Sequence, residues 1–165
     1  MTLMNIAYQR LLNQRLAVQT LQKPDEVVRW LGAVQAQDYA AAKWAVAQRT
    51  KGITDSVVDQ ALDKGEILRT HVMRPTWHFI ATEDIRWLLE LTAPRVHAAN
   101  AYQYRRLELD KTIFKQRNAA LTKALRDGQQ LTRAELASVL QQAGIEANDL
   151  LRLTYLILRA FPLIT

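Results

Sequence analysis

The sequence predicts a mainly α-helical protein with a small β-hairpin wing, arranged as one complete winged helix-turn-helix module and an incomplete second module. Two observations predict this fold class. Apolar residues recur at helical spacing through most of the chain, while residues 66–81 carry short runs of β-branched and aromatic residues around a proline. Three helices followed by a two-stranded hairpin form the order of a winged helix.

Residues 1–81 are expected to form an N-terminal helix and the first winged-helix module. Residues 4–18 place apolar side chains near helical spacing. Pro24 is followed by two acidic residues, which is typical of the first turn of a helix. We expect this helix to end near Gly32, because glycine readily adopts the backbone conformation that closes a helix.

Two shorter helices are expected before the hairpin. Asp38 is the predicted N-cap of a helix over about residues 39–49. Thr54 or Asp55 would cap the next helix, which a glycine closes at position 65. With the helix that starts at the proline, these complete the three helices of the module.

Residues 66–81 predict a strand, a turn and a second strand. In a strand, alternate residues share a face, so Arg69 and His71 lie on the same side and Arg74 lies at the tip of the turn. Guanidinium groups on a wing can hold phosphates, so these residues are candidate DNA contacts. A solvated hairpin face with satisfied histidines explains the pattern equally well.

The tryptophans lie in apolar patterns, and we assign three of them to the core. These are Trp30, Trp44 and Trp87. Trp77 is treated separately, because it follows the turn of the hairpin and hairpin tips can insert between base pairs.

Residues 82–110 are expected to form a helical connector, and residues 111–165 an incomplete second winged-helix module. The connector starts with a capping threonine, Thr82, and continues past a proline. In the second module, the sequence from Thr132 to Glu135 matches a capping box. No hairpin sequence follows the third helix, so we expect a truncated chain that can self-associate through apolar surface of this module.

Composition narrows the function classes. The chain has 165 residues, of which 49% are hydrophobic, so it can enclose a core. It contains no cysteine, and its three histidines lack metal-ligand spacing, so we expect neither a metal nor a cofactor. No apolar run could span a bilayer and the first residues lack a signal core, which predicts a cytoplasmic protein with no membrane partner.

Positive charge is concentrated in residues 101–133. Eight basic residues stand against three acidic ones there, which accounts for +5 of the net charge of +6. The basic residues are Arg105, Arg106, Lys111, Lys115, Arg117, Lys123, Arg126 and Arg133. A phosphate-binding surface and an ordinary solvated helix face both explain this charge, and we retain Arg105 and Arg106 as candidate DNA contacts.

Residues 32–44, GAVQAQDYAAAKW, place two amide side chains, Gln35 and Gln37, just before a helix. Residues two apart share a face only where the chain is extended, so the pair can converge on one ligand only in a strand or turn. The two amides can serve backbone groups at a helix junction. Alternatively, they can position water for hydrolysis of a cationic N-alkylated purine, whose leaving group needs no protonation.

The segments GAVQAQDYAAAKWAVAQR and GEILRTHVMRPTWHFIA resemble those of the winged-helix DNA glycosylases that excise N7-alkylated purines and unhook interstrand crosslinks, a family that includes the azinomycin-resistance glycosylases. The resemblance covers most of residues 5–160. The family's catalytic motif is a glutamine, a variable residue, and a glutamine or aspartate. It implies that Gln35 and Gln37 are catalytic residues that position the hydrolytic water. It also implies DNA-contact or site-shaping roles for Arg74, Thr76 and His78.

The resemblance implies a metal-free monofunctional glycosylase that acts in DNA repair on alkylated or crosslinked duplex DNA. We therefore expect a cytoplasmic protein that is nucleoid-associated when bound to DNA. Relatives are longer, with further winged-helix modules and a C-terminal β-rich domain, which again predicts truncation. Two alternatives remain: a non-catalytic winged-helix DNA-binding protein such as a transcriptional regulator, and an inactive truncated remnant.

Overall fold

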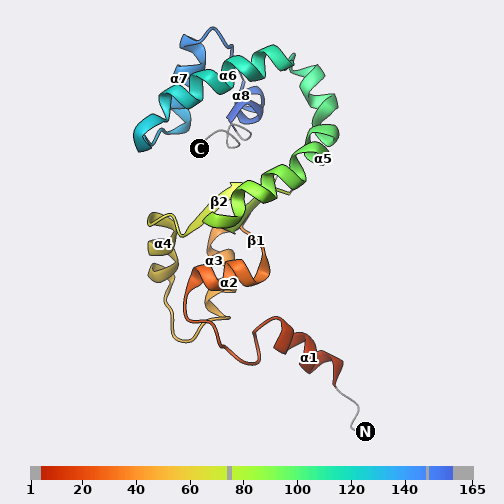
Figure 1. Cartoon of the computed structure of the whole chain (residues 1–165), viewed down its shortest axis with the longest axis vertical. Helices are drawn as coiled ribbons and strands as arrows, with labels where there is room; N and C mark the ends of the chain where they lie inside the picture. Colours follow the sequence, from red (N-terminus) through yellow and green to blue (C-terminus); the bar gives the residue numbers. More distant parts are fainter. Residues whose placement is uncertain (1–4, 74–75, 148, 158–165) are drawn as a thin grey trace. The chain divides into compact units, whose positions relative to one another are not determined.

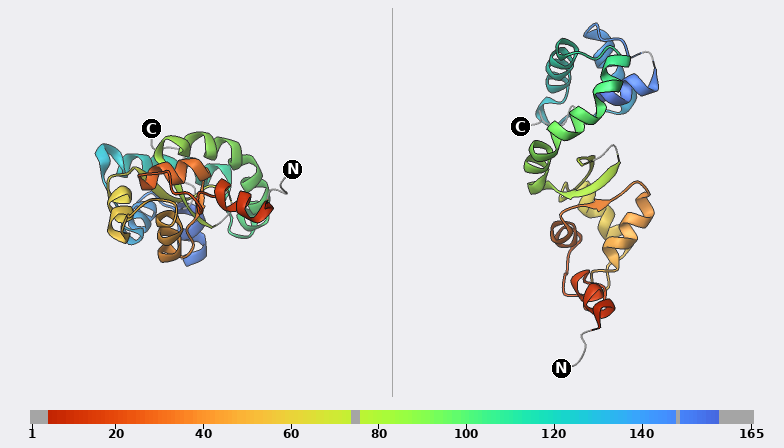
Figure 2. Two further views of the ribbon diagram at one scale, coloured as in Figure 1. Left: turned by 90° about the horizontal axis from the view of Figure 1, so that it is seen from below. Right: turned by 90° about the vertical axis from the view of Figure 1, so that its right-hand side faces the viewer.

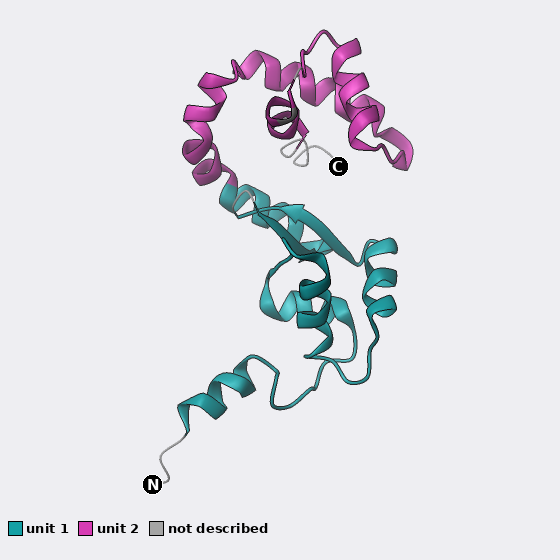
Figure 3. Ribbon diagram, turned by 180° about the vertical axis from the view of Figure 1, so that it is seen from behind, with its two compact units in different colours: residues 1–92 teal, residues 93–165 magenta. Residues whose placement is uncertain are grey.

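The computed structural model describes residues 5–73, 76–147 and 149–157 (Figure 1). The chain divides into two compact units, Met1–Thr92 (unit 1) and Ala93–Thr165 (unit 2), which are coloured separately in Figure 3. The division falls within the predicted connector. Within the described ranges, no helix combines the length and apolar character needed to cross a membrane.

The described residues of unit 1 form four helices and a three-stranded sheet before the connector. The helices are α1 (Ile6–Asn13), α2 (Pro24–Leu31), α3 (Tyr39–Ala47) and α4 (Asp55–Asp63), and the strands are β1 (Val34–Gln35), β2 (Ile67–His71) and β3 (Trp77–Ala81). The strand order is β1-β3-β2, and both pairs are antiparallel. The predicted fold class, mainly α with a small hairpin wing, is confirmed. The third strand, β1, was not predicted, because two residues are too few to show strand alternation.

Local capping signals determine where the helices begin and end. Helix α2 starts at Pro24, and its C-cap is Gly32, whose φ of 74° few other residues adopt readily. The Asp38 carboxylate accepts a hydrogen bond from the Ala41 N–H at 3.0 Å and caps α3, as predicted. Helix α4 follows Thr54, whose side chain makes no capping hydrogen bond to the described helix.

The sheet is covered on both faces, because neighbouring residues of a strand point to opposite sides. Phe79 packs with Val27, Val28 and other residues of α2, α3 and α4. Its neighbour Ile80 packs on the other face with Leu88 of α5 (Ile85–Arg106). Figure 2 shows the strands with these helices in two further views. The glutamine-bearing strand β1 is therefore fixed to a well-packed module.

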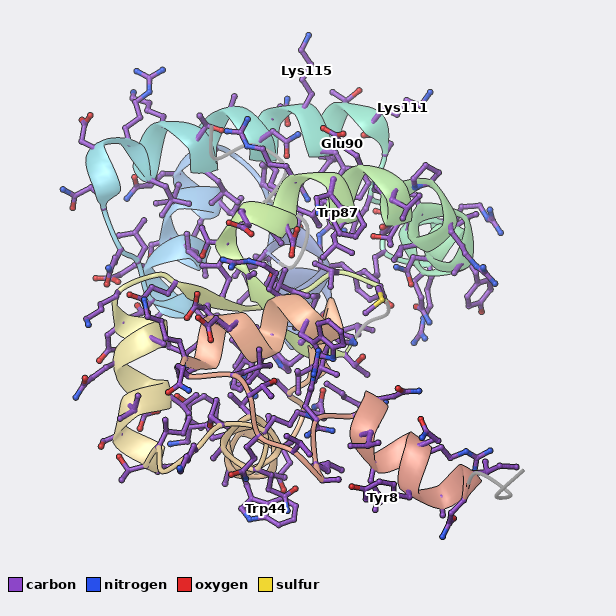
Figure 4. The ribbon with its side chains drawn as sticks, turned by 60° about the horizontal axis from the view of Figure 1, so that its bottom comes forward. Tyr8, Trp44, Trp87, Glu90, Lys111 and Lys115 are labelled. Carbon is purple, nitrogen blue, oxygen red and sulfur yellow. The ribbon has the colours of Figure 1, made fainter. Side chains whose placement is uncertain are left out.

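The assignment of three tryptophans to the core is wrong. Trp30, Trp44 and Trp87 are 51%, 64% and 48% exposed, and Figure 4 shows Trp44 projecting away from the ribbon. In α2 the buried face is supplied by Val27 and Val28, so Trp30 lies on the outer face. There the Arg15 guanidinium lies 4.1 Å from the centre of its ring.

The connector and unit 2 are helical in the described residues. They comprise η1 (Thr82–Asp84), α5 (Ile85–Arg106), α6 (Lys111–Ala124), η2 (Arg126–Gly128), α7 (Arg133–Gln142) and α8 (Leu150–Ile157). The Thr82 hydroxyl donates to the Gly65 carbonyl and does not cap α5, so that prediction is wrong. The α7 capping box is confirmed, since Thr132 and Glu135 bond each other's backbone N–H groups.

Unit 2 encloses a core of its own. The buried residues are Leu107, Leu109, Leu121, Leu140, Ile145 and Leu156. They come from the end of the connector and from α6, α7 and the segments that follow. Leu151 on α8 remains 43% exposed, and self-association through this unit stays a prediction.

Candidate functional site

The two glutamines lie on the edge of the sheet, just before α3. Gln35 is the second residue of β1, and Gln37 precedes the N-cap of α3. Both side chains are exposed, whereas Ala36 between them is fully buried. The backbone is extended at Val34 and Gln35 and bends at Gln37, just before α3.

The Gln37 side chain is held by the neighbouring strand. Its Oε1 accepts a hydrogen bond from the backbone N–H of Trp77 at 3.3 Å. Because the partner is a donor, the oxygen of the amide must face it. An amide oxygen has two lone pairs, so this oxygen can accept a second hydrogen bond from water.

The Gln35 amide makes no hydrogen bond to the described part of the chain. It lies directly opposite His78 in the β1–β3 register, so both side chains belong to one face of the sheet. His78 is only 3% exposed, and its ring Nδ1 lies 2.9 Å from the Thr76 carbonyl oxygen. A carbonyl only accepts, so Nδ1 carries the hydrogen and donates it. This hydrogen bond ties the His78 ring to the backbone just before β3, and a site-shaping role stays a prediction.

Arg69 lies beside the glutamine motif. Its Nε and Nη2 donate to the Ala36 carbonyl at 3.2 and 2.9 Å, and Nη2 also donates to the Gln37 carbonyl at 3.5 Å. The guanidinium carbon lies 5.2 Å from the centre of the Tyr39 ring and 4.8 Å from that of Trp77. No sequence pattern indicates this contact, because more than thirty residues separate Arg69 from the motif.

A polar cluster continues from Tyr39 toward α4. The Tyr39 hydroxyl donates to Asp59 at 2.6 Å, and the Lys43 ammonium group donates to Asp55 and, at 2.9 Å, to Asp59. Hydrogen bonds to Asp55 and Asp59 raise the pKa of Lys43. Hydrogen bonds from Tyr39 and Lys43 lower the pKa of Asp59. Burial, followed by the hydrogen bond to Asp59, raises the pKa of Tyr39. The signal that could have indicated this cluster is a lysine inside the apolar run AAAKWAVA.

The other predicted DNA contacts of the hairpin have different surroundings. His71 is half-buried, and its ring centre lies 4.0 Å from that of Trp77. Thr76 is half-buried, and its hydroxyl oxygen has no hydrogen bond within the described residues. Arg74 lies outside the described residues.

The basic segment of unit 2 is largely exposed. Seven of its eight basic side chains are exposed, including Arg105 and Arg106 at the end of α5. Figure 4 shows Lys111 and Lys115 projecting from α6. Arg117 is the exception and corrects its assignment to this surface, since it is 4% exposed and donates to the Leu156 carbonyl at 3.4 Å.

Comparisons with known proteins agree with the motif. A protein-family model described as "DNA glycosylase AlkZ-like" matches residues 28–163, which include the glutamine motif and the hairpin. The solved structure of Streptomyces sahachiroi DNA glycosylase AlkZ is similar, with a TM-score of 0.75 and 21% sequence identity. The match covers 90% of this chain and 42% of that protein. No curated protein matches in sequence.

Proposed function

Because this chain belongs to the AlkZ-like DNA glycosylase family, we propose that it hydrolyses the N-glycosidic bond of N7-alkylated purines or crosslinked bases in duplex DNA. Membership of the family supports DNA glycosylase activity in DNA repair, and the choice of a cationic lesion rests on the two amide side chains. The observation that carries it is the held amide of Gln37, which leaves a lone pair for water beside the exposed amide of Gln35.

In this mechanism, a water molecule is held for attack on C1′ of the modified nucleotide. Gln37 Oε1 accepts a hydrogen bond from the water, and Gln35, two residues before it, offers a second exposed amide. The C1′–N9 bond breaks, and the alkylated purine takes the bonding electrons and leaves as a neutral base. The water oxygen bonds to C1′ and its proton passes to solvent, because an amide is too weak a base to retain it.

Single-turnover excision tests the proposal. The substrate is duplex DNA with one N7-methylguanine, and the variants are Gln37→Ala and the control Gln60→Ala, which alters an exposed glutamine of α4. We expect base release by the wild type and the control, and release slower by about a hundredfold or more with Gln37→Ala, since lost positioning costs about that much. Duplex affinity is expected to stay equal. Equal rates for all three proteins would contradict the assignment of Gln37.

The second candidate is a non-catalytic DNA-binding protein, which the exposed basic residues of unit 2 favour. In that case all three proteins bind the duplex in a salt-dependent manner and none releases base. The chain spans 42% of the relative's length. The third alternative, an inactive protein, would show neither base release nor specific binding.

A further inference from the structure

The β1–β3 ladder ends in an exchange of hydrogen-bond partners. The register pairs Gln35 with His78, which places Ala36 opposite Trp77, and the Ala36 N–H donates to the Trp77 carbonyl at 2.7 Å. In an antiparallel ladder such a pair makes both bonds, so the Trp77 N–H would donate to the Ala36 carbonyl. Instead it donates to Oε1 of Gln37 at 3.3 Å.

The Ala36 carbonyl is occupied by Arg69. Both Nε and Nη2 donate to it, at 3.2 and 2.9 Å. The rings of Tyr39 and Trp77 lie 5.2 and 4.8 Å from the guanidinium carbon, so the planar group is restrained by ring faces as well as by hydrogen bonds. A carbonyl oxygen has two lone pairs, so the two N–H groups of Arg69 together take the acceptor that the Trp77 N–H would otherwise use.

We propose that Arg69 is a positioning residue: by binding the Ala36 carbonyl, it leaves the Trp77 N–H to fix the Gln37 amide. The catalytic consequence rests on the proposed function, while the effect on the Gln37 side chain is independent of activity. A phosphate contact is the competing role for Arg69. That role draws on the same guanidinium, whose Nε and Nη2 are bonded to protein carbonyls here.

The experiment uses the full chain with Arg69→Met, Arg69→Lys and the control Arg86→Met. Methionine keeps much of the stem without donors, and lysine keeps the charge without the planar fork. Arg86 is an exposed arginine of α5 in the same unit, so its removal matches the loss of charge. If Arg69→Met does not fold, as judged by circular dichroism, Arg69→Lys carries both readouts.

The first readout is nuclear magnetic resonance of the Gln37 side-chain amide and the Trp77 backbone amide. We expect both Arg69 variants to move the Gln37 resonances to the averaged values of a free side chain, and to shift the Trp77 amide as it returns to the Ala36 carbonyl. Arg86→Met is expected to change neither. Unchanged Gln37 resonances in the folded Arg69 variants would overturn the proposal, whether or not the protein has activity.

The second readout is the single-turnover rate at saturating protein, with duplex affinity at several salt concentrations. We expect Arg69→Met to slow base release by about ten- to a hundredfold. Affinity and its salt dependence are expected to match those of Arg86→Met. A phosphate contact would instead weaken binding, lower the salt slope by about one and be restored by Arg69→Lys.

A double variant shows whether Arg69 acts through Gln37. Adding Arg69→Met to Gln37→Ala is expected to slow release no further, because the group being positioned is already absent. A full additional loss would overturn the proposal. If the wild type releases no base, the proposed function fails, and the resonance measurement alone decides the positioning role.

Discussion

Unit 1 and unit 2 carry the same number of basic residues but differ in their acidic ones. Residues 1–92 contain eleven basic and ten acidic residues, a net charge of +1, whereas residues 93–165 contain eleven and six, a net charge of +5. The glutamine motif and all four tryptophans belong to unit 1. The candidate site thus lies on a nearly neutral unit, and most of the net positive charge belongs to the other.

Substitutions in the cores of the two units are expected to have the largest effects, and they test whether the units unfold separately. Phe79 is fully buried in unit 1, so Phe79→Ala is expected to lower that unit's free energy of unfolding by about 3–5 kcal/mol. Tryptophan fluorescence reports unit 1 alone, since every tryptophan lies there, while far-ultraviolet circular dichroism follows the helices of both. The measurement is urea unfolding with both signals.

Leu140→Ala is the matched change in unit 2. Leu140 is also fully buried, and its loss is expected to cost about 2–5 kcal/mol in that unit while the fluorescence transition stays in place. If either variant shifts both signals equally, the two units unfold as one cooperative body and their separation fails.

The charge difference predicts that unit 2 contributes to DNA affinity and that unit 1 determines the rate of base release. Lys111→Gln with Lys115→Gln removes two exposed charges from α6 and is expected to reduce the salt slope of duplex binding by up to about two. The saturating single-turnover rate is expected to stay unchanged. Lys64→Gln removes one exposed charge from unit 1 and is the control. An equal loss of affinity with this control would show that unit 2 has no special part in binding.

Sequence alone was sufficient where a local signal fixes the structure. Pro24, Asp38 and the capping box that starts at Thr132 each act within one helical turn, and each was predicted. The burial of Arg117 could also have been predicted from local spacing. This residue lies between Ile113 and Leu121 at helical spacing, on the stripe that packs into the core.

Long-range pairing explains what the sequence did not indicate. Strand β1 is a strand only because β3 lies beside it, and Arg69 meets the glutamine motif only through the sheet. The burial of an aromatic side chain also depends on what packs against it, which is why Trp30 and Trp44 were assigned wrongly. Apolar character predicts a preference for the interior, while tertiary structure decides which candidates reach it.

Acid titration gives a smaller test, with one carboxylate in each unit. Hydrogen bonds from Tyr39 and then Lys43 hold the pKa of Asp59 below its ordinary value in unit 1. In unit 2, the backbone N–H and then the hydroxyl of Thr132 lower the pKa of Glu135. A carboxylate whose pKa is lower in the folded than in the unfolded protein stabilises the fold at pH values above its unfolded pKa, which is about 4 for either group. This stabilisation is lost as the pH falls through the folded-state pKa.

The pKa shifts of Asp59 and its cationic partner Lys43 have opposite directions, so their contributions to stability are lost at opposite ends of the pH range. Because the pKa of Lys43 is raised, its contribution is complete below about 10.4 and is lost only as pH rises above that value. Between pH 6 and pH 3, Asp59→Asn is therefore expected to flatten the fall of the urea midpoint seen by tryptophan fluorescence. Glu135→Gln should leave that signal unchanged and flatten only the part of the circular dichroism transition that belongs to unit 2. If Asp59→Asn leaves the acid slope of the fluorescence midpoint as steep as in the wild type, the cluster of Tyr39, Lys43 and Asp59 is not what stabilises unit 1 against acid.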